Sequence, residues 1–355
     1  MNNKRLFLDI HIIQTVPPSN INRDDTGSPK TAQYGGVRRA RVSSQSWKKA
    51  MRDYFYNNSV QENVGVRTLE LVQYLKEKIL KINDELDEEK AKELAIDVLK
   101  AAGISLKDEK AKALFFMGDT QARGLAQAAL DGVKDKKVLQ KILKEKTAID
   151  IALFGRMVAD DPSLNEDASS QVAHAISTHA VQTEFDFFTA VDDKKPENDA
   201  GAGMLGTVEY NSSTLYRYAN VAAHELLNQL EDKESTINTL KLYVEAFSNS
   251  MPTGKINTFA NQTLPQLILV NLRIDRPVNL VNAFEKPVRS SDGYVYESIN
   301  RLFEAEREVE KFVKESVASY YLLLNKQEVV TNSNETESLK DLLEELTSDL
   351  NSLLD

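Results

Sequence analysis

Strand-like segments lie at both ends of this sequence, and a long block with helical periodicity separates them. The first 14 residues alternate between apolar and other side chains, which predicts a strand over 5–14. Strand patterns return at 185–191, 214–221 and 266–274, whereas 63–179 has helical spacing. The sequence therefore predicts an α+β fold in which a helical insertion interrupts a sheet that is completed after it. A four-stranded ferredoxin-like or RRM-like sheet accommodates these strands.

The composition indicates an ordinary globular protein. The chain has 355 residues, of which 41% are hydrophobic and 28% charged, and it contains no cysteine. Disulfides and cysteine-based metal sites are therefore excluded, and a reducing cytoplasm is the compartment we expect. The opening MNNKRLFLDIHIIQ has basic residues before an apolar run, but Asp9 and His11 interrupt that run, so a strand explains it better than a signal peptide. No apolar stretch approaches the length of a membrane span.

One short segment departs from the acidic character of the chain. Between Arg23 and Arg52 there are eight basic residues and only two acidic ones, although the whole chain has a net charge of −10. A basic track on an acidic exterior is compatible with RNA binding in one orientation, because screening limits each phosphate to its close neighbourhood. An ordinary basic surface is the alternative, and composition does not separate the two.

The end of this segment has the pattern of an amphipathic helix over 44–56. One stripe is polar, and we expect it to face outward: Gln45, Lys48, Lys49 and Arg52. The opposite stripe is apolar, and we expect it to face the core: Trp47, Ala50, Met51 and Tyr54. Ser43 or Ser44 is a plausible N-cap, so hydroxyls, free backbone N–H groups and basic side chains would converge in a phosphate site. A solvated helix surface remains open as the alternative.

Several motifs in fixed order resemble those of one known family, the CasC backbone subunits of type I-E CRISPR Cascade complexes. The longest is NRDDTGSPKTAQYGGVRRARVSSQSWKKAMR at 22–52. The others are DIALFGRM (150–157), AHAISTH (173–179), DFFTAVDD (186–193), LGT (205–207), YRYANV (216–221) and VNAFEKPV (281–288). Together they extend over most of the chain, up to about residue 288.

The resemblance implies a hand-like protein with an RNA-binding palm, helical fingers and a hairpin thumb. Copies would polymerise along a CRISPR RNA together with the other Cascade subunits and leave its bases free to pair with target DNA. The implied divisions are palm at 1–57, fingers at 58–181, a palm strand at 182–192, the thumb at 193–210, palm again at 211–330 and an acidic surface helix or tail at 331–355.

The resemblance also implies which residues meet the guide. The backbone contacts would be Arg23, Lys30, Arg41, Ser43, Gln45, Lys48 and Arg52, with Arg38 and Lys49 added because of their place in the basic segment. The side chains that wedge between bases or stabilise kinks would be Met157, Phe188, Thr189 and Leu205. A second stripe, Lys134, Lys137, Lys141 and Lys144, is a possible DNA-binding surface, although a solvated helix face is the favoured explanation, because lysine-rich helices are common.

No catalytic or cofactor motif stands out, and we expect a protein that is not an enzyme and needs no cofactor or metal. His174 and His179 lack metal-ligand spacing and are expected to be core or hydrogen-bonding residues. The enzymatic alternative is a metal-dependent endoribonuclease that uses Asp24 and Asp25. We expect these carboxylates instead to cap a turn and to pair with Arg23 or Arg38. A helical scaffold that binds only proteins is a third possibility.

Overall fold

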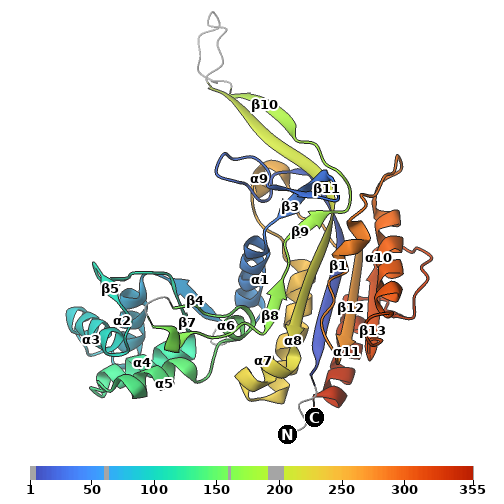
Figure 1. The fold of residues 1–355 in the computed structure, drawn as a ribbon. Helices are drawn as coiled ribbons and strands as arrows, with labels where there is room; N and C mark the ends of the chain where they lie inside the picture. Colours follow the sequence, from blue (N-terminus) through green and yellow to red (C-terminus); the bar gives the residue numbers. More distant parts are fainter. Residues whose placement is uncertain (1–4, 60–63, 159–160, 191–203, 355) are drawn as a thin grey trace, which may run out of the picture.

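The computed structural model describes residues 5–59, 64–158, 161–190 and 204–354. Its centre is a ten-stranded, mostly antiparallel sheet with the order β14-β13-β12-β1-β11-β9-β3-β2, and β8 and β10 also pair with β11 (Figure 1). The strands are β1 (Phe7–Ser19), β2 (Thr31–Tyr34), β3 (Val37–Val42), β8 (Ser170–Val172), β9 (Ala175–Ser177), β10 (Glu184–Ala190), β11 (Met204–Ala222), β12 (Leu267–Arg273), β13 (Ala318–Leu323) and β14 (Asn334–Glu335). The predicted α+β fold is confirmed.

Two long strands, β1 and β11, form the middle of the sheet. Ile10 of β1 lies opposite Ala219 of β11 on one side and Val270 of β12 on the other. β1 runs beyond the predicted range of 5–14, because its pairing with β11 continues through an irregularity to Ser19. Side chains alternate along a strand, so each residue of β1 faces one of two helical layers.

Helices cover both faces of this sheet, and we call the sheet with these helices the palm. On the face of Ile10, one core is formed with helices α1 (Ser44–Asn58), α7 (Ala223–Leu230), α8 (Lys233–Asn249) and α11 (Leu339–Leu353). On the other face, a second core contains α10 (Val295–Val309) and the short η3 (Leu280–Phe284). Among the described helices, none has the length and apolar composition that a bilayer span requires.

The insertion folds around a core of its own and lies to one side of the palm (Figure 1). We call it the fingers. Its elements are β4 (Gly65–Thr68), α2 (Leu71–Ile82), α3 (Glu88–Ala101), β5 (Leu106–Lys107), β6 (Lys110–Ala111), β7 (Phe115–Gly118), α4 (Asp119–Leu130), α5 (Lys136–Lys144), α6 (Ile149–Phe154) and η2 (Pro162–Leu164). The chain returns to the palm sheet at β8 and β9, which pair with β11. This return comes before residue 181, the predicted end of the fingers.

A two-stranded hairpin projects from the end of the sheet (Figure 1). It consists of β10 and the outer part of β11, in the register Phe188↔Gly206. Residues 182–192 were predicted to form a palm strand, but β10 pairs with β11 alone and all seven of its residues are exposed, so we group this strand with the thumb. Most of the remaining thumb, 193–203, lies outside the described residues.

The last part of the chain differs most from its prediction. Residues 293–325 contain both the helix α10 and the strand β13, because Ala318–Leu323 adds to the sheet beside β12. The expected acidic surface tail at 331–355 contains α11, whose inner side is packed against the core of the palm. The leucines buried there are Leu342, Leu343, Leu346 and Leu350. Its acidic residues conceal an apolar face at helical spacing.

Candidate nucleic-acid interface

Helix α1 stands at the centre of the predicted interface, and its inner face fixes its orientation. Trp47, Ala50, Met51 and Phe55 are buried. Phe55 takes the place expected for Tyr54, which is half-buried and donates its hydroxyl hydrogen to Glu245 at 2.8 Å. Gln45 and Lys49 are exposed as predicted. The predicted amphipathic helix is therefore confirmed, with Lys48 and Arg52 at the border between its two faces.

The beginning of α1 is held by side chains from three segments. Ser43 is the N-cap, and its hydroxyl accepts a hydrogen bond from the Ser46 N–H. Ser43 is itself buried and donates its own N–H to Asn22, so its hydroxyl supports the helix from inside. The N–H of Ser44 points outward to Nδ1 of His174 at 3.3 Å.

Two predicted cations gather at the same helix terminus. Arg41 donates from Nε to the Thr31 carbonyl, and its NH1 lies 3.4 Å from Nδ1 of His174. Burial lowers the pKa of His174, and the positive charges of Arg41 and Lys30 lower it further. His174 is thus a neutral hydrogen-bonding residue, as predicted, and it lies in a field of positive charge that favours an anion.

The consecutive arginines Arg38 and Arg39 have opposite environments. Arg38 is exposed on the β2–β3 hairpin. Arg39 is fully buried and donates to the carbonyls of Tyr34, Ser177 and Phe284, which ties the hairpin to the palm. Arg39 therefore has a structural role, and of the two only Arg38 is available to a ligand.

Lys48 is half-buried without a carboxylate partner among the described residues. Its ammonium group lies 5.5 Å from the centre of the Phe154 ring, and burial lowers its pKa. A partly desolvated lysine attracts a phosphate more strongly than an exposed lysine does, because water screens the two charges less.

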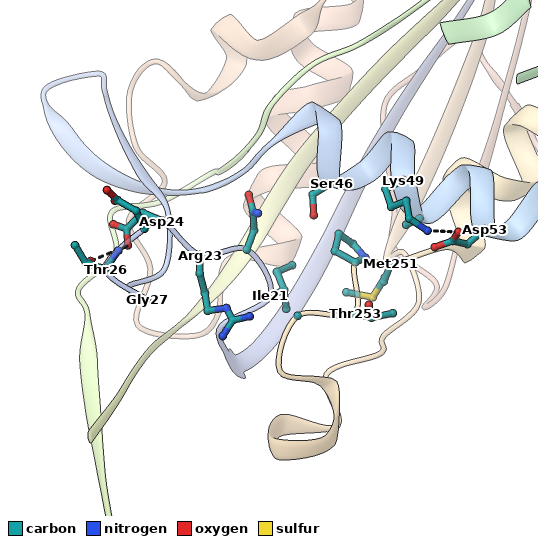
Figure 2. Close-up of a pocket in the computed structure, with 15 residues that line it drawn as sticks. Ile21, Arg23, Asp24, Thr26, Gly27, Ser46, Lys49, Asp53, Met251 and Thr253 are labelled. Carbon is teal, nitrogen blue, oxygen red and sulfur yellow. Dashed lines mark hydrogen bonds and ion pairs between the residues drawn. The ribbon is translucent and has the colours of Figure 1, made fainter. Parts of the chain in front are cut away.

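A cleft of about 630 Å³ opens beside α1 (Figure 2). Its walls are the loop 21–27, one side of α1 and the loop 251–254. Lys49 lines this cleft and pairs with Asp53, and Arg23 is exposed at its opposite end (Figure 2). Lys49 and Arg23 therefore belong to one concave surface, whereas Lys48 lies on another side of the helix.

Arg52 departs from the predicted stripe. Its side chain turns toward the fingers, where Nε contacts the buried carboxylate of Asp150 at 3.1 Å. The expectation that Arg52 points into solvent is wrong, because Asp150 lies far along the sequence and its position is set by the return of the fingers to the palm.

The predicted wedge residues include the most exposed apolar side chains of the interface. Met157 is 82% exposed after α6, and Leu205 is 62% exposed on the hairpin. Phe185 and Phe187, which were not among the predicted wedge residues, are exposed to a similar degree, at 66% and 65%. The alternation of Phe185 and Phe187 in an exposed strand was the signal that could have identified them.

Phe188 and Thr189 belong to the same exposed ribbon as Leu205. Thr189 lies opposite Leu205, and Phe188 lies opposite Gly206. A Cβ atom on Gly206 would come within 2.4 Å of the Phe188 ring, so the ring rests directly over the glycine backbone. Phe188 is the least exposed phenylalanine of the three because of this contact.

The lysine stripe of the fingers is exposed but only partly helical. Lys137, Lys141 and Lys144 lie on α5, whereas Lys134 precedes its N-cap Asp135. Lys141 lies 3.5 Å from Glu145 in an exposed pair, which contributes little to stability. The structure leaves these lysines accessible, and their DNA-binding role stays a prediction.

The Asp24–Asp25 pair forms a turn. The Asp24 carboxylate accepts hydrogen bonds from the N–H groups of Thr26 and Ser28 and from the Thr26 hydroxyl, which lowers its pKa. The predicted turn cap is confirmed, and Asp24 makes no ion pair with Arg23 or Arg38 in the described structure. No cluster of three or more acidic or histidine side chains among the described residues is arranged to hold a metal ion.

Two solved structures that resemble this one come from complexes with nearly the same name. One, named "CRISPR RNA-guided surveillance complex, pre-nicking", has 32% sequence identity and a TM-score of 0.88, with 97% of this chain and 100% of that chain covered. Another, named "CRISPR RNA-guided surveillance complex", has 29% identity and a TM-score of 0.66, with 97% and 99% covered. No curated protein sequence matches the chain.

A model of one protein family matches almost the whole chain. It is described as "CT1975-like protein" and covers residues 8–348, which include the palm, the fingers and the hairpin. The match therefore extends beyond the motifs at 22–288 and takes in β13 and most of α11 as well. This chain belongs to the CT1975-like protein family.

Proposed function

We propose that this protein is a guide-RNA-binding backbone subunit of a CRISPR surveillance complex of the Cascade type, in its type I-E form. The likeness to surveillance-complex subunits over 97% of the chain supports the assignment. The observation that carries RNA binding is the set of accessible cations around the start of α1. They are Arg23, Lys30, Arg38, Arg41, Lys48 and Lys49.

This arrangement suits a ligand whose sequence varies. Arginine, lysine, backbone N–H groups and the Gln45 amide grip phosphates and sugars without reading bases. Exposed apolar residues such as Met157 and Leu205 pack on any base, because every base has an apolar face. A guide held in this way keeps its base edges free for pairing with target DNA.

The projecting hairpin supports assembly of several copies along one RNA. A two-stranded ribbon is marginally stable in isolation, and this one exposes phenylalanines on a strand with no second layer. A neighbouring copy that covers the ribbon would bury these rings. Such a contact joins two different surfaces, so it can repeat from copy to copy along a filament.

We propose further that the subunit binds without cutting and works in the cytoplasm, to which the lack of cysteine is suited. Asp24 uses its carboxylate in a turn, so an endoribonuclease has no specific support. Assembled complex incubated with complementary RNA and magnesium should leave that RNA intact. Regular cuts that disappear in Asp24→Ala would overturn this part of the proposal.

The phosphate grip has a direct test in the salt dependence of RNA binding. The affinity of the purified protein for single-stranded RNA should fall with salt, at a logarithmic slope of about −0.7 for each phosphate neutralised. Lys48→Gln should make this slope less negative by about 0.7, and Lys340→Gln on α11 should leave it unchanged. Salt-independent binding, or equal slopes for Lys48→Gln and the parent, would contradict the proposal.

A further inference from the structure

We propose that Arg52 is a positioning residue, which locks the fingers to the guide-binding helix α1 and does not itself grip the guide. This inference rests on the proposed function. It divides the basic stripe of α1 into residues that face a ligand and one residue that sets the geometry of the site.

The contacts of Arg52 all lead to the fingers or to their return to the palm. Its Nε lies 3.1 Å from Oδ2 of Asp150 on α6, and NH2 donates to the Gly65 carbonyl of β4 at 3.2 Å. Its guanidinium carbon lies 4.3 Å from the centre of the Phe116 ring on β7. Arg52 thus contacts two strands of the fingers and the helix α6, whose Ile149, Ala152 and Leu153 are buried in the palm core.

Asp150 completes the lock from the other side. It is fully buried, and its second oxygen accepts the N–H of Gly65 at 2.8 Å. Arg52 and Asp150 therefore clamp the backbone of Gly65 between them. Burial opposes the charged form of Asp150, and Arg52 is the charge that compensates for it. A guanidinium group that already makes these contacts is poorly placed to bind a phosphate.

The same helix connects the lock to a predicted guide contact. α6 begins next to Asp150 and carries Phe154, whose ring lies under Lys48. Arg156 follows, buried, and donates to the carbonyls of Phe116, Leu143 and Leu164. Met157 comes directly after it. The distance between Lys48, which holds the backbone, and Met157, which meets a base, is therefore set by how α6 docks on α1.

The lock also explains why arginine suits this position. A planar guanidinium can donate in two directions while its face rests on an aromatic ring, whereas a lysine ammonium cannot do all three. We therefore expect Arg52→Lys to restore only part of what Arg52→Gln removes.

The test uses three lock variants, which are Arg52→Gln, Asp150→Asn and the double variant that combines these two changes. Each is compared with Lys48→Gln, which removes a proposed phosphate contact. Asp150→Asn is nearly isosteric and can still accept the N–H of Gly65. Both single lock variants should weaken cooperative assembly on single-stranded RNA about tenfold, with the salt slope unchanged. The double variant should be no weaker than the worse single one, because both remove the same interaction. Lys48→Gln should shift the slope by about 0.7.

Hydrogen exchange of the protein without RNA gives an independent readout. The backbone amides of β4 and α6 should exchange faster in both lock variants and at the parent rate in Lys48→Gln. A slope shift in Arg52→Gln, together with unchanged assembly in Asp150→Asn, would overturn the inference and make Arg52 a phosphate contact. If no variant affects RNA binding but exchange still rises in the lock variants, the proposed function fails and the lock stands.

Discussion

A single strand, β11, passes through two contrasting environments. Its inner part, 211–222, lies in the middle of the sheet and is almost entirely buried, whereas its outer part, 204–210, forms one arm of the hairpin and is half-buried to exposed. Both parts carry large apolar side chains. In the inner part those side chains build the core, whereas in the outer part Met204 and Leu205 are largely exposed. The contrast supports the proposed contact between the outer part and a neighbouring copy.

The largest effect should come from the inner part, at Arg217. This arginine is 1% exposed, lies between the rings of Trp47 and Phe247, and donates to Gln14 and to the Phe247 carbonyl. Arg217→Ala leaves a cavity and unpaired polar groups, so the free energy of unfolding should fall by about 4 kcal/mol in urea titrations. Lys340→Ala, on the exposed side of α11, is the control and should change it by less than about 0.5 kcal/mol. Similar values for the two would mean that the inner part is not the core.

The second effect also concerns the inner part and depends on pH. His11 is buried beside Tyr216 and Tyr218, and burial and the charge of Arg273 lower its pKa to about 3. Between pH 6.5 and 3 the unfolded chain binds a proton that the folded chain refuses, so this group makes stability fall as pH falls. Burial raises the pKa of the neighbouring Asp9 to about 6, so Asp9 acts in the opposite direction between pH 6 and 3.8.

The variant His11→Gln separates these two contributions. It keeps a neutral hydrogen-bonding side chain and removes the imidazole, whose protonation in the unfolded chain lowers the free energy of unfolding at acidic pH. On going from pH 7 to pH 4, the variant should lose less unfolding free energy than the parent, by about 3.5 kcal/mol, from about 2.5 pH units at about 1.4 kcal/mol each. Equal changes for the parent and the variant would show that His11 titrates normally in the fold.

The third effect belongs to the outer part and should be absent from stability measurements. Phe187 and Leu205 share one face of the hairpin, because Leu205 lies opposite Thr189, two residues from Phe187. The double variant Phe187→Ser, Leu205→Ser should unfold within about 0.5 kcal/mol of the parent. Its assembly on RNA should weaken at least tenfold, which sedimentation of the complex with a long RNA can measure. A loss of stability without a loss of assembly would reverse the assignment of the two parts.

The smallest effect is expected at Gly206, where the Phe188 ring rests on the backbone. Gly206→Ala must displace that ring, because the new methyl group would lie 2.4 Å from it. We expect a change in unfolding free energy below about 0.5 kcal/mol and a shifted ring resonance of Phe188 in NMR spectra. A loss above about 1 kcal/mol would mean that the hairpin folds together with the palm.

Local patterns in the sequence were sufficient for much of the fold. The alternation near Ile10 and the amphipathic spacing around Trp47 are set by neighbouring residues, so the strand and the helix could be predicted. The strand β13 could not, because its apolar run continues a helical pattern and only pairing with β12 decides between them. The buried face of α11 was hidden for a similar reason, since its acidic residues dominate the composition of the tail.

The candidate site divides along the same line. Charge density identified the segment, and the family resemblance selected residues within it. Arg38 was selected and Arg39 was not, but neither approach could show the physical reason, which is that one faces solvent and the other is held by carbonyls from distant segments. Neither could pair Arg52 with Asp150, which is brought to α1 only when the fingers fold back onto the palm. Long-range packing thus determines which cations of a basic segment remain free.

The continuity of β11 also has a mechanical consequence. The strand passes from the hairpin into the sheet without an intervening loop, and its pairing with β1 is in register from Phe7↔Ala222 to Val16↔Ser213. Tension on the hairpin would act along the axis of β11. The hydrogen bonds to β1 lie across that axis, so they would be loaded in shear and would have to break together before the strand could slide. We expect a filament of the proposed kind, when it is under tension, to separate between subunits before any subunit unravels.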